Sequence, residues 1–152
     1  MFFKKKKKDE KPEVLSKENI VLNCHAKDSD DAIVQMGQLL LKAGFIQEGY
    51  IQGMLNRDHS LSTYLGNGVA IPHGEFEVAD CVKKTGLGIM VFPEGVDWGK
   101  EKAYLVIGIA AKGDQHMEVL SNLAEKLIEP DDVQKLINGT QDYIYESLNQ
   151  KS

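Results

Sequence analysis

Residues 86–111 read GLGIMVFPEGVDWGKEKAYLVIGIAA and contain two long apolar runs. GLGIMVF (86–92) and AYLVIGIAA (103–111) are rich in β-branched and aromatic residues and are nearly continuous in apolar character. A strand that is covered on both faces shows this pattern, because both of its alternating sets of side chains are buried. We therefore expect two buried strands here, separated by a turn signal at Pro93-Glu94-Gly95.

Shorter strand-like runs and several helical segments surround this pair. ENIVLN (18–23), TYL (63–65) and VAI (69–71) have the composition of strands, and Asn67-Gly68 is a turn signal. Helical signals appear in five segments, with Asp28 and Asp114 as expected N-terminal caps: residues 30–44, 48–58, 113–129, 130–137 and 141–149. This order predicts an α/β fold, a mixed β-sheet flanked by helices on both faces.

The net charge of −5 over 152 residues is unevenly distributed. Residues 1–11 contain six Lys with Asp9 and Glu10, so the remaining residues carry a net charge of −9. Such an acidic body is a poor binder of nucleic acid, because phosphate contacts need clustered Lys and Arg. We expect a flexible lysine-rich tail over residues 1–15 and a single domain over residues 16–152. The tail is either simply solvated or in weak contact with an anionic membrane surface, and both interpretations stay open.

The sequence also bears on localisation. No run of 18 or more apolar residues occurs, so no membrane span is predicted. Residues 1–11, MFFKKKKKDEK, are not followed by the apolar segment of a secretory signal. Cys24 and Cys81 lie far apart without a CxxC pair, which favours reduced thiols. We therefore expect a cytoplasmic protein.

Two of the four histidines occupy positions where α/β proteins place reactive groups. His73 follows the VAI run, and His116 comes one glycine-containing turn after the second buried strand, in the first turn of a helix. If the two strands are neighbours in the sheet, both imidazoles emerge at one edge. Pro72 leads the chain rigidly into His73, and Gly74 lacks a Cβ. We therefore expect an exposed imidazole that a partner's backbone or phosphate can approach closely.

The other histidines and the cysteines match no pattern for a metal or a nucleotide. His25 and His59 are expected at the surface, and the spacings of His and Cys fit no zinc motif. A P-loop, a GxGxxG fingerprint and a GxSxG elbow are all absent from the sequence. We therefore predict no metal site and no cofactor.

These features suit a histidine that accepts a phosphoryl group from another protein. A neutral imidazole is a competent nucleophile near pH 7, because its unperturbed pKa is about 6.5. The phosphoryl group brings up to about two negative charges, which call for cationic or polar donors. Arg57 offers a planar set of donors at the end of the second helix, and His116 offers another. We predict His73, His116 and Arg57 as the catalytic residues.

The blocks around these residues resemble a known family. GNGVAIPHG (66–74), PEGVDWG (93–99), LVIGIAA (105–111) and GDQHMEVLSNLAEKL (113–127) are similar to the enzyme IIA domains of the bacterial phosphotransferase system, in the mannitol/fructose class. The likeness runs from Asn19 to Leu148 and implies a mixed sheet flanked by helices. It places the family's phosphorylated histidine on His73, its second active-centre histidine on His116, and its arginine on Arg57, within MLNRDHSLSTYLG (54–66).

The resemblance also implies the partners of the reaction. The phosphoryl group, ultimately from phosphoenolpyruvate through enzyme I, arrives from phospho-HPr and leaves for a cysteine of enzyme IIB. Enzyme IIB and the membrane component IIC are expected as separate polypeptides. The IPHG and PEGVDWG blocks favour the mannitol branch. Two alternatives stay open: a fructose-specific or nitrogen-regulatory module that acts by partner binding, and a non-catalytic α/β domain with incidental histidines.

Overall fold

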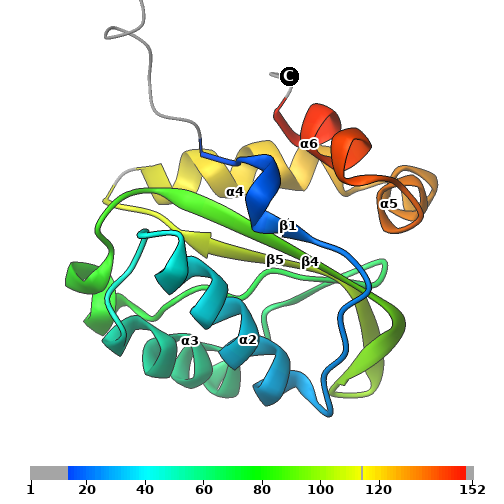
Figure 1. The fold of residues 1–152 in the computed structure, drawn as a ribbon. Helices are drawn as coiled ribbons and strands as arrows, with labels where there is room; N and C mark the ends of the chain where they lie inside the picture. The colour runs from blue at the N-terminus through cyan, green and yellow to red at the C-terminus, as the bar shows by residue number, and fades with distance from the viewer. Residues whose placement is uncertain (1–13, 114, 150–152) are drawn as a thin grey trace, which may run out of the picture.

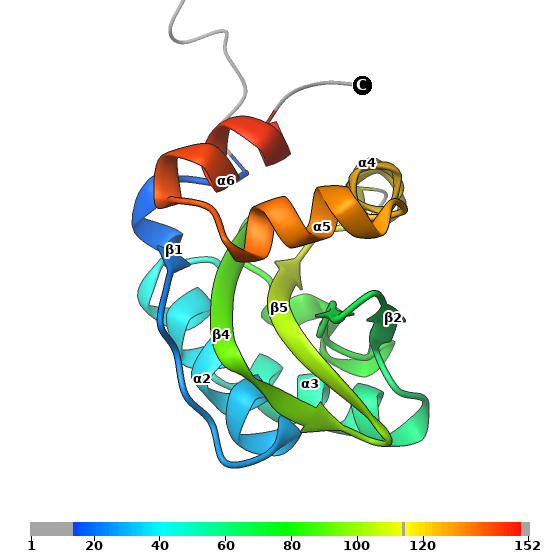
Figure 2. The same cartoon turned by 90° about the vertical axis from the view of Figure 1, so that its right-hand side faces the viewer.

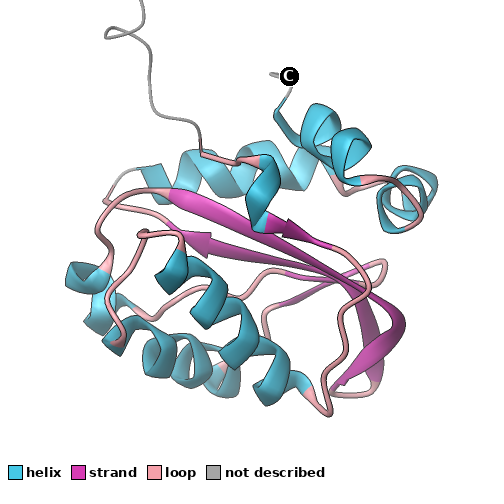
Figure 3. Cartoon of the chain, viewed as in Figure 1, coloured by secondary structure: helices cyan, strands magenta, loops and turns pink. Residues whose placement is uncertain are grey.

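The computed structural model of the chain describes residues 14–113 and 115–149 (Figure 1). Its helices are α2 (Ser29–Lys42), α3 (Gly49–Ser60), α4 (Gln115–Lys126), α5 (Pro130–Ile137) and α6 (Gln141–Asn149), with short 3-10 helices η1 (Lys17–Asn19) and η2 (Phe76–Cys81). Its strands are β1 (Ile20–Val21), β2 (Tyr64–Gly66), β3 (Val69–Ala70), β4 (Gly86–Trp98) and β5 (Glu101–Ala110). Figure 3 shows how the helices enclose the strands.

In the described part of the chain the strands form one five-stranded sheet in the order β1-β4-β5-β3-β2. The long strands β4 and β5 are antiparallel neighbours at its centre. β1 joins β4 and β3 joins β5 in parallel, whereas β2 joins β3 in antiparallel fashion. The sheet is therefore mixed, as predicted.

Both faces of the sheet are covered, which explains the continuous apolar runs of β4 and β5. Figures 1 and 2 show α2 and α3 on one face and α4, α5 and α6 on the other. Met90, Phe92 and Val106 belong to the core under α2 and α3. Their neighbours Val91 and Leu105 belong to the core under α4, α5 and α6. The predicted α/β sandwich with helices on both faces is confirmed.

The helices lie close to their predicted positions, and two of them begin with a recognisable signal. The Asp28 side chain accepts a hydrogen bond from the backbone N–H of Asp31 at 2.8 Å, which caps α2. Pro130 opens α5, where its missing N–H costs no helical hydrogen bond. The other predicted cap, Asp114, lies outside the described residues.

Two strand predictions are wrong in detail. Pro93-Glu94-Gly95 does not end β4, which continues to Trp98 with a register shift between Val91 and Val96. Val96 and Trp98 are both buried and hold this second part of the strand on the core, so the three residues form an irregularity inside it. The predicted strand at 18–23 is also shorter, because η1 occupies its beginning and only Ile20–Val21 pair with β4.

The folded part already includes residues close to the lysine run. The backbone N–H of Leu87 donates to the carbonyl of Val14 at 2.9 Å, and Leu15 is 1% exposed. The lysines themselves lie outside the described residues, so the flexible tail and its membrane contact stay predictions. Among the residues described, no helix is both long enough and apolar enough to cross a membrane. Cys24 and Cys81 are free thiols.

Candidate functional site

His73 lies where β3 has just left its regular pairing with β5. Ile71 and Pro72 carry the chain from β3 to His73, which forms an isolated parallel bridge with Ile109 of β5. The backbone N–H of Ile109 donates to the carbonyl of Pro72 at 3.0 Å. The two strands that precede the predicted histidines are therefore neighbours, and both end at the same edge of the sheet.

The His73 ring is held by its own chain. Nδ1 lies 2.8 Å from the carbonyl oxygen of Ile71. A carbonyl oxygen can only accept, so we assign the proton to Nδ1 and the lone pair of the neutral ring to Nε2. The residue is only 8% exposed, so the expectation of an exposed imidazole is wrong. The ring sits in the wall of a pocket rather than on the surface.

A pocket of about 280 Å³ brings His73 and Arg57 together. Its lining comes from α3, the segment after β3, η2 and the end of β5: Tyr50, Arg57, His73, Gly74, Glu75, Phe76, Ala79, Val82, Ala111 and Gly113. A larger hollow of about 660 Å³ lies along α5 and α6, but its lining includes neither a histidine nor an arginine. The smaller pocket is therefore the candidate site.

Arg57 lies in the last turn of α3, as predicted, and lines the same pocket as His73. Its Nη1 donates to the carbonyl of Leu61, which orients the guanidinium. Among the described residues no carboxylate oxygen lies within 4.0 Å of the guanidinium. Within the described part of the chain its positive charge is thus not paired with a carboxylate, so it can be used for an incoming anion.

His116 lies in the first turn of α4, immediately beyond the pocket residues Ala111 and Gly113. Its side chain is outside what the structure describes. The loop before α4 is fixed by Thr85, whose hydroxyl contacts the side chain of Gln115 and accepts the backbone N–H of Lys112 at 3.1 Å. The backbone therefore brings His116 to the sheet edge that also carries His73.

Gly74 does not leave open space beside His73. A Cβ at Gly74 would lie 2.4 Å from Cε1 of Tyr50, so the tyrosine ring already occupies the space that the sequence assigned to a partner. The Tyr50 hydroxyl accepts the backbone N–H of Gly74 at 2.8 Å and donates to the carbonyl of Ile109 at 2.9 Å. Burial raises the pKa of Tyr50, although the hydrogen bond from Gly74 opposes this. The hydroxyl therefore stays protonated near neutral pH.

Glu75 is a second pocket residue that sequence reasoning missed. Its backbone N–H donates to the carbonyl of Gly53 at 3.2 Å, and its carboxylate accepts from the side-chain amide of Asn56 at 2.9 Å. Both partners lie in α3, so the segment after His73 is tied to the helix that carries Arg57. No local pattern in the sequence points to Glu75, because its partner Asn56 lies 19 residues away in the chain.

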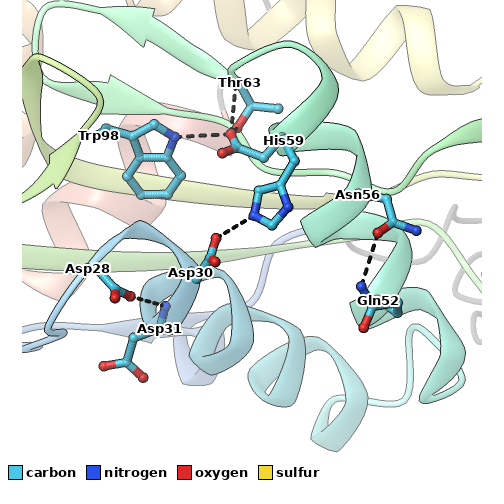
Figure 4. A network of polar contacts seen from close by, with 9 residues as sticks. Asp28, Asp30, Asp31, Gln52, Asn56, His59, Thr63 and Trp98 are labelled. Atoms are coloured by element: carbon cyan, nitrogen blue, oxygen red, sulfur yellow. Dashed lines mark hydrogen bonds and ion pairs between the residues drawn. The ribbon is translucent and has the colours of Figure 1, made fainter.

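The C-terminal end of α3 is fixed by Asp58, the residue after Arg57. Its Oδ1 accepts from the backbone N–H of Thr63 at 2.8 Å, from the Thr63 hydroxyl at 2.6 Å and from Nε1 of Trp98 at 3.0 Å. Figure 4 shows Thr63 and Trp98 converging on this carboxylate. Because Trp98 ends β4, this contact ties the arginine's helix to the centre of the sheet.

His25 and His59 are both exposed and line no part of the pocket, which agrees with their predicted surface positions. His59 Nε2 lies 2.7 Å from Oδ1 of Asp30, so it joins the end of α3 to the start of α2 (Figure 4). Neither residue belongs to the candidate site.

Comparison with known proteins identifies the family. A family model described as "Phosphoenolpyruvate-dependent sugar phosphotransferase system, EIIA 2" matches residues 13–151. The chain belongs to this family. The predicted resemblance is therefore confirmed over nearly the whole domain.

Curated relatives of two lengths are similar to this EIIA 2 chain. It is 46% identical over 127 residues to the multiphosphoryl transfer protein of Haemophilus influenzae, covering 83% of this chain but 26% of that protein. It is 38% identical over 127 residues to the mannitol-specific phosphotransferase enzyme IIA component of Staphylococcus aureus, covering 84% of this chain and 88% of that protein. The chain thus spans about a quarter of the longer relative and nearly all of the shorter one.

Solved structures agree with the fold. The crystal structure of IIA mannitol from Escherichia coli is 38% identical with a TM-score of 0.82, covering 88% of this chain and 97% of that one. The Escherichia coli complex of enzyme IIAMTL with phosphorylated enzyme IIBMTL contains a chain that is 38% identical with a TM-score of 0.81, covering 86% and 94%. The chain therefore has the same fold as these two solved structures.

Proposed function

We propose that this chain is a phosphoryl carrier of a bacterial sugar phosphotransferase system. It accepts a phosphoryl group from phospho-HPr on His73 and passes it to a cysteine of enzyme IIB for the uptake and phosphorylation of mannitol. The observation that carries the proposal is the His73 ring, whose Nδ1 is bound to the Ile71 carbonyl in a pocket shared with Arg57. Because Nδ1 is bound to this carbonyl, Nε2 is the nitrogen that would attack a phosphoryl donor.

Each transfer exchanges one bond to phosphorus for another. The Nε2 lone pair attacks phosphorus, the bond to the donor atom on HPr breaks, and its electron pair stays with HPr. In the second step a thiolate of enzyme IIB attacks the same phosphorus, and the electron pair of the N–P bond returns to Nε2. Such transfers depend mainly on positioning and charge stabilisation, so the chain needs no cofactor of its own.

Arg57 and His116 are the proposed stabilising residues. The Arg57 guanidinium, without a carboxylate partner among the described residues, can place its planar donors on the phosphoryl oxygens. His116, in the first turn of α4, stands at a helix end that favours anions. Both groups offset the negative charge that the phosphoryl group brings into an acidic protein.

Mannitol as the sugar is supported by the names of two relatives that are 38% identical, from Staphylococcus aureus and Escherichia coli. The complex formed in Escherichia coli supports enzyme IIB as the acceptor. We place the reaction in the cytoplasm, where thiols such as Cys24 and Cys81 stay reduced. Transfer assays with purified enzyme IIB components for mannitol and for fructose distinguish these sugars, and transfer to neither favours a regulatory module.

The acceptor is tested by labelling. The chain is incubated with phosphoenolpyruvate, enzyme I and HPr, and the modified residue is mapped by mass spectrometry at neutral or alkaline pH. We expect one phosphoryl group on His73, none in His73→Ala, and normal labelling in the controls His25→Ala and His59→Ala. Full labelling of His73→Ala would show that another residue is the acceptor.

The proposed role of His116 predicts that its loss affects the two transfers differently. We expect His116→Ala to accept a phosphoryl group from phospho-HPr but to pass it to enzyme IIB at least about tenfold more slowly, because one stabilising donor is lost. Rapid-quench measurement of each transfer provides the comparison. Transfer to enzyme IIB at the wild-type rate would remove His116 from the mechanism.

A further inference from the structure

Tyr50 joins the two strands at the point where His73 leaves the sheet. β3 pairs with β5 in parallel at Val69–Leu105 and Ala70–Val106, and the pairing resumes as a bridge between His73 and Ile109. On one side of this bridge the Ile109 N–H reaches the Pro72 carbonyl directly, at 3.0 Å. On the other side the Tyr50 hydroxyl connects the Gly74 N–H, at 2.8 Å, to the Ile109 carbonyl, at 2.9 Å.

The tyrosine has little freedom to move. It is 4% exposed, and its ring lies against the Cα of Gly74, where a Cβ would be 2.4 Å from Cε1. Its hydroxyl uses both its donor and an acceptor position on backbone groups, of Ile109 in β5 and of Gly74 in the segment after β3. The hydroxyl therefore fixes the separation between Ile109 and the backbone just after His73.

A second tyrosine does the same at the other end of β3. The Tyr64 hydroxyl accepts the backbone N–H of Gly68 at 2.9 Å and donates to the carbonyl of Lys102 at 3.2 Å. A tyrosine hydroxyl thus lies at each end of β3. Each hydroxyl accepts a hydrogen bond from a glycine N–H and donates one to a carbonyl of β5. Of the two tyrosines, only Tyr50 lines the His73 pocket, so Tyr64 can serve as the control for Tyr50.

We propose that Tyr50 is a positioning residue for His73. Its hydroxyl sets the path of the His73–Gly74 backbone relative to β5 and so orients the imidazole in the pocket beside Arg57. The bond from Nδ1 to the Ile71 carbonyl also holds the ring. The inference rests on the proposed role of His73 as phosphoryl acceptor. It assigns Tyr50 a role that acts through the backbone next to His73.

The test compares Tyr50→Phe with Tyr64→Phe in the full chain. Each change keeps the ring and removes the same kind of hydroxyl bridge, and urea unfolding measures how much stability each variant loses. We expect Tyr50→Phe alone to slow phosphoryl transfer to His73 by roughly tenfold to a hundredfold, at an unchanged half-saturating concentration of phospho-HPr. We also expect the ¹⁵N resonances of the His73 ring, in the unphosphorylated protein, to move in Tyr50→Phe and not in Tyr64→Phe.

The outcomes distinguish three cases: Tyr50 positions His73, loss of either hydroxyl loosens the whole fold, or the proposed function is wrong. Unchanged transfer and an unchanged His73 spectrum in Tyr50→Phe would overturn the inference, and so would equal slowing in both variants. If the wild-type chain is not labelled on His73, the proposed function fails, and the ring spectrum still decides whether Tyr50 positions the imidazole. Should Tyr50→Phe not fold, Gly74→Ala, which pushes the Tyr50 ring away, must produce the same spectral change.

Discussion

At the residue scale, Glu75 introduces a negative charge into the pocket that holds His73. Its carboxylate is bound by the Asn56 amide at 2.9 Å and, among the described residues, forms no ion pair with Arg57. On the proposed function, a phosphoryl group on His73 would share its pocket with the Arg57 guanidinium and the Glu75 carboxylate. The carboxylate would raise the free energy of the phosphohistidine and so favour release of the phosphoryl group to the next protein.

Replacing Glu75 by Gln should make the phosphorylated state more stable. Glutamine keeps the bond to Asn56 through its carbonyl oxygen, and removal of one nearby charge is worth about 1 kcal/mol at an intermediate dielectric. We expect the equilibrium with phospho-HPr to shift about fivefold towards the phosphorylated chain at low salt. The phosphorylated fraction can be measured by mass spectrometry in defined mixtures of HPr and phospho-HPr.

Glu77 provides the matched control for this change. It lies in η2, two residues after Glu75, but is exposed and does not line the pocket. Glu77→Gln should leave the equilibrium close to wild type, and added salt should weaken the effect of Glu75→Gln. An equal shift in both variants would mean that overall charge, rather than the position of Glu75, is responsible.

At the element scale, an ion pair joins α2 to α3 at the ends nearest each other. His59 in the last turn of α3 meets Asp30 in the first turn of α2. The hydrogen bond and the charge of Asp30 raise the pKa of His59 above its ordinary value of 6.5, with a smaller contribution from Asp58. Both partners are more than half exposed, so the contribution to stability is modest.

This pair predicts a pH dependence of stability. Because the folded-state pKa lies above the unfolded one, the contribution is fully present below about pH 6.5 and is lost as the pH rises through the folded pKa. We expect wild type to be more resistant to urea than His59→Gln at pH 5.5, and the difference to vanish at pH 9. His25→Gln, which changes another exposed histidine, should show no such trend. A constant difference across this range would contradict a charged pair.

The sequence predicted helices and strands well where residues close together in the chain determine them. The Asp28 cap, Pro130 and the continuous apolar runs of β4 and β5 each depend on neighbouring residues, and the corresponding elements were predicted. Pro93-Glu94-Gly95 looked like a turn, because the burial of Val96 that keeps the strand going is a long-range effect. His73 and Arg57 were likewise identified from local patterns, and they line one pocket.

The roles of Tyr50 and Glu75 could not be predicted in the same way. Tyr50 is a buried residue of α3, but its hydroxyl partners are on β5 and after β3. Glu75 is held by Asn56, which is 19 residues away in the chain. Contacts of this kind depend on how α3 packs against the sheet, and no periodicity in the sequence encodes that packing.

At the scale of the whole molecule, α2 packs very closely on the sheet. Gly88 and Gly108 are partners in β4 and β5, and Met36 of α2 lies directly over them. A Cβ on Gly108 would lie 2.3 Å from Cγ of Met36, and a Cβ on Gly88 would lie 2.9 Å from its Sδ. The glycine pair therefore sets the distance between the helix layer and the sheet.

Gly108→Ala should destabilise the protein despite the intrinsic preference for alanine. The lower backbone entropy of alanine favours it by about 0.5–1 kcal/mol, but overpacking against Met36 costs about 1–3 kcal/mol. We expect a net loss in the free energy of unfolding in urea. In a Met36→Ala background the same change should cost much less, because the space is vacant. An equal cost in both backgrounds would show that Met36 is not the obstacle.

Because β3 pairs with β5, the pocket around His73 can form only late in folding and synthesis. β4 and β5 are joined by a tight turn and can pair early, whereas the pairing of Val69 with Leu105 spans a segment that contains η2 and β4. During synthesis His73 is made before Ile109, its partner across the sheet. Until β5 is made, His73 lacks the strand next to which its pocket forms. The proposed phosphoryl transfer therefore requires that this central strand be complete.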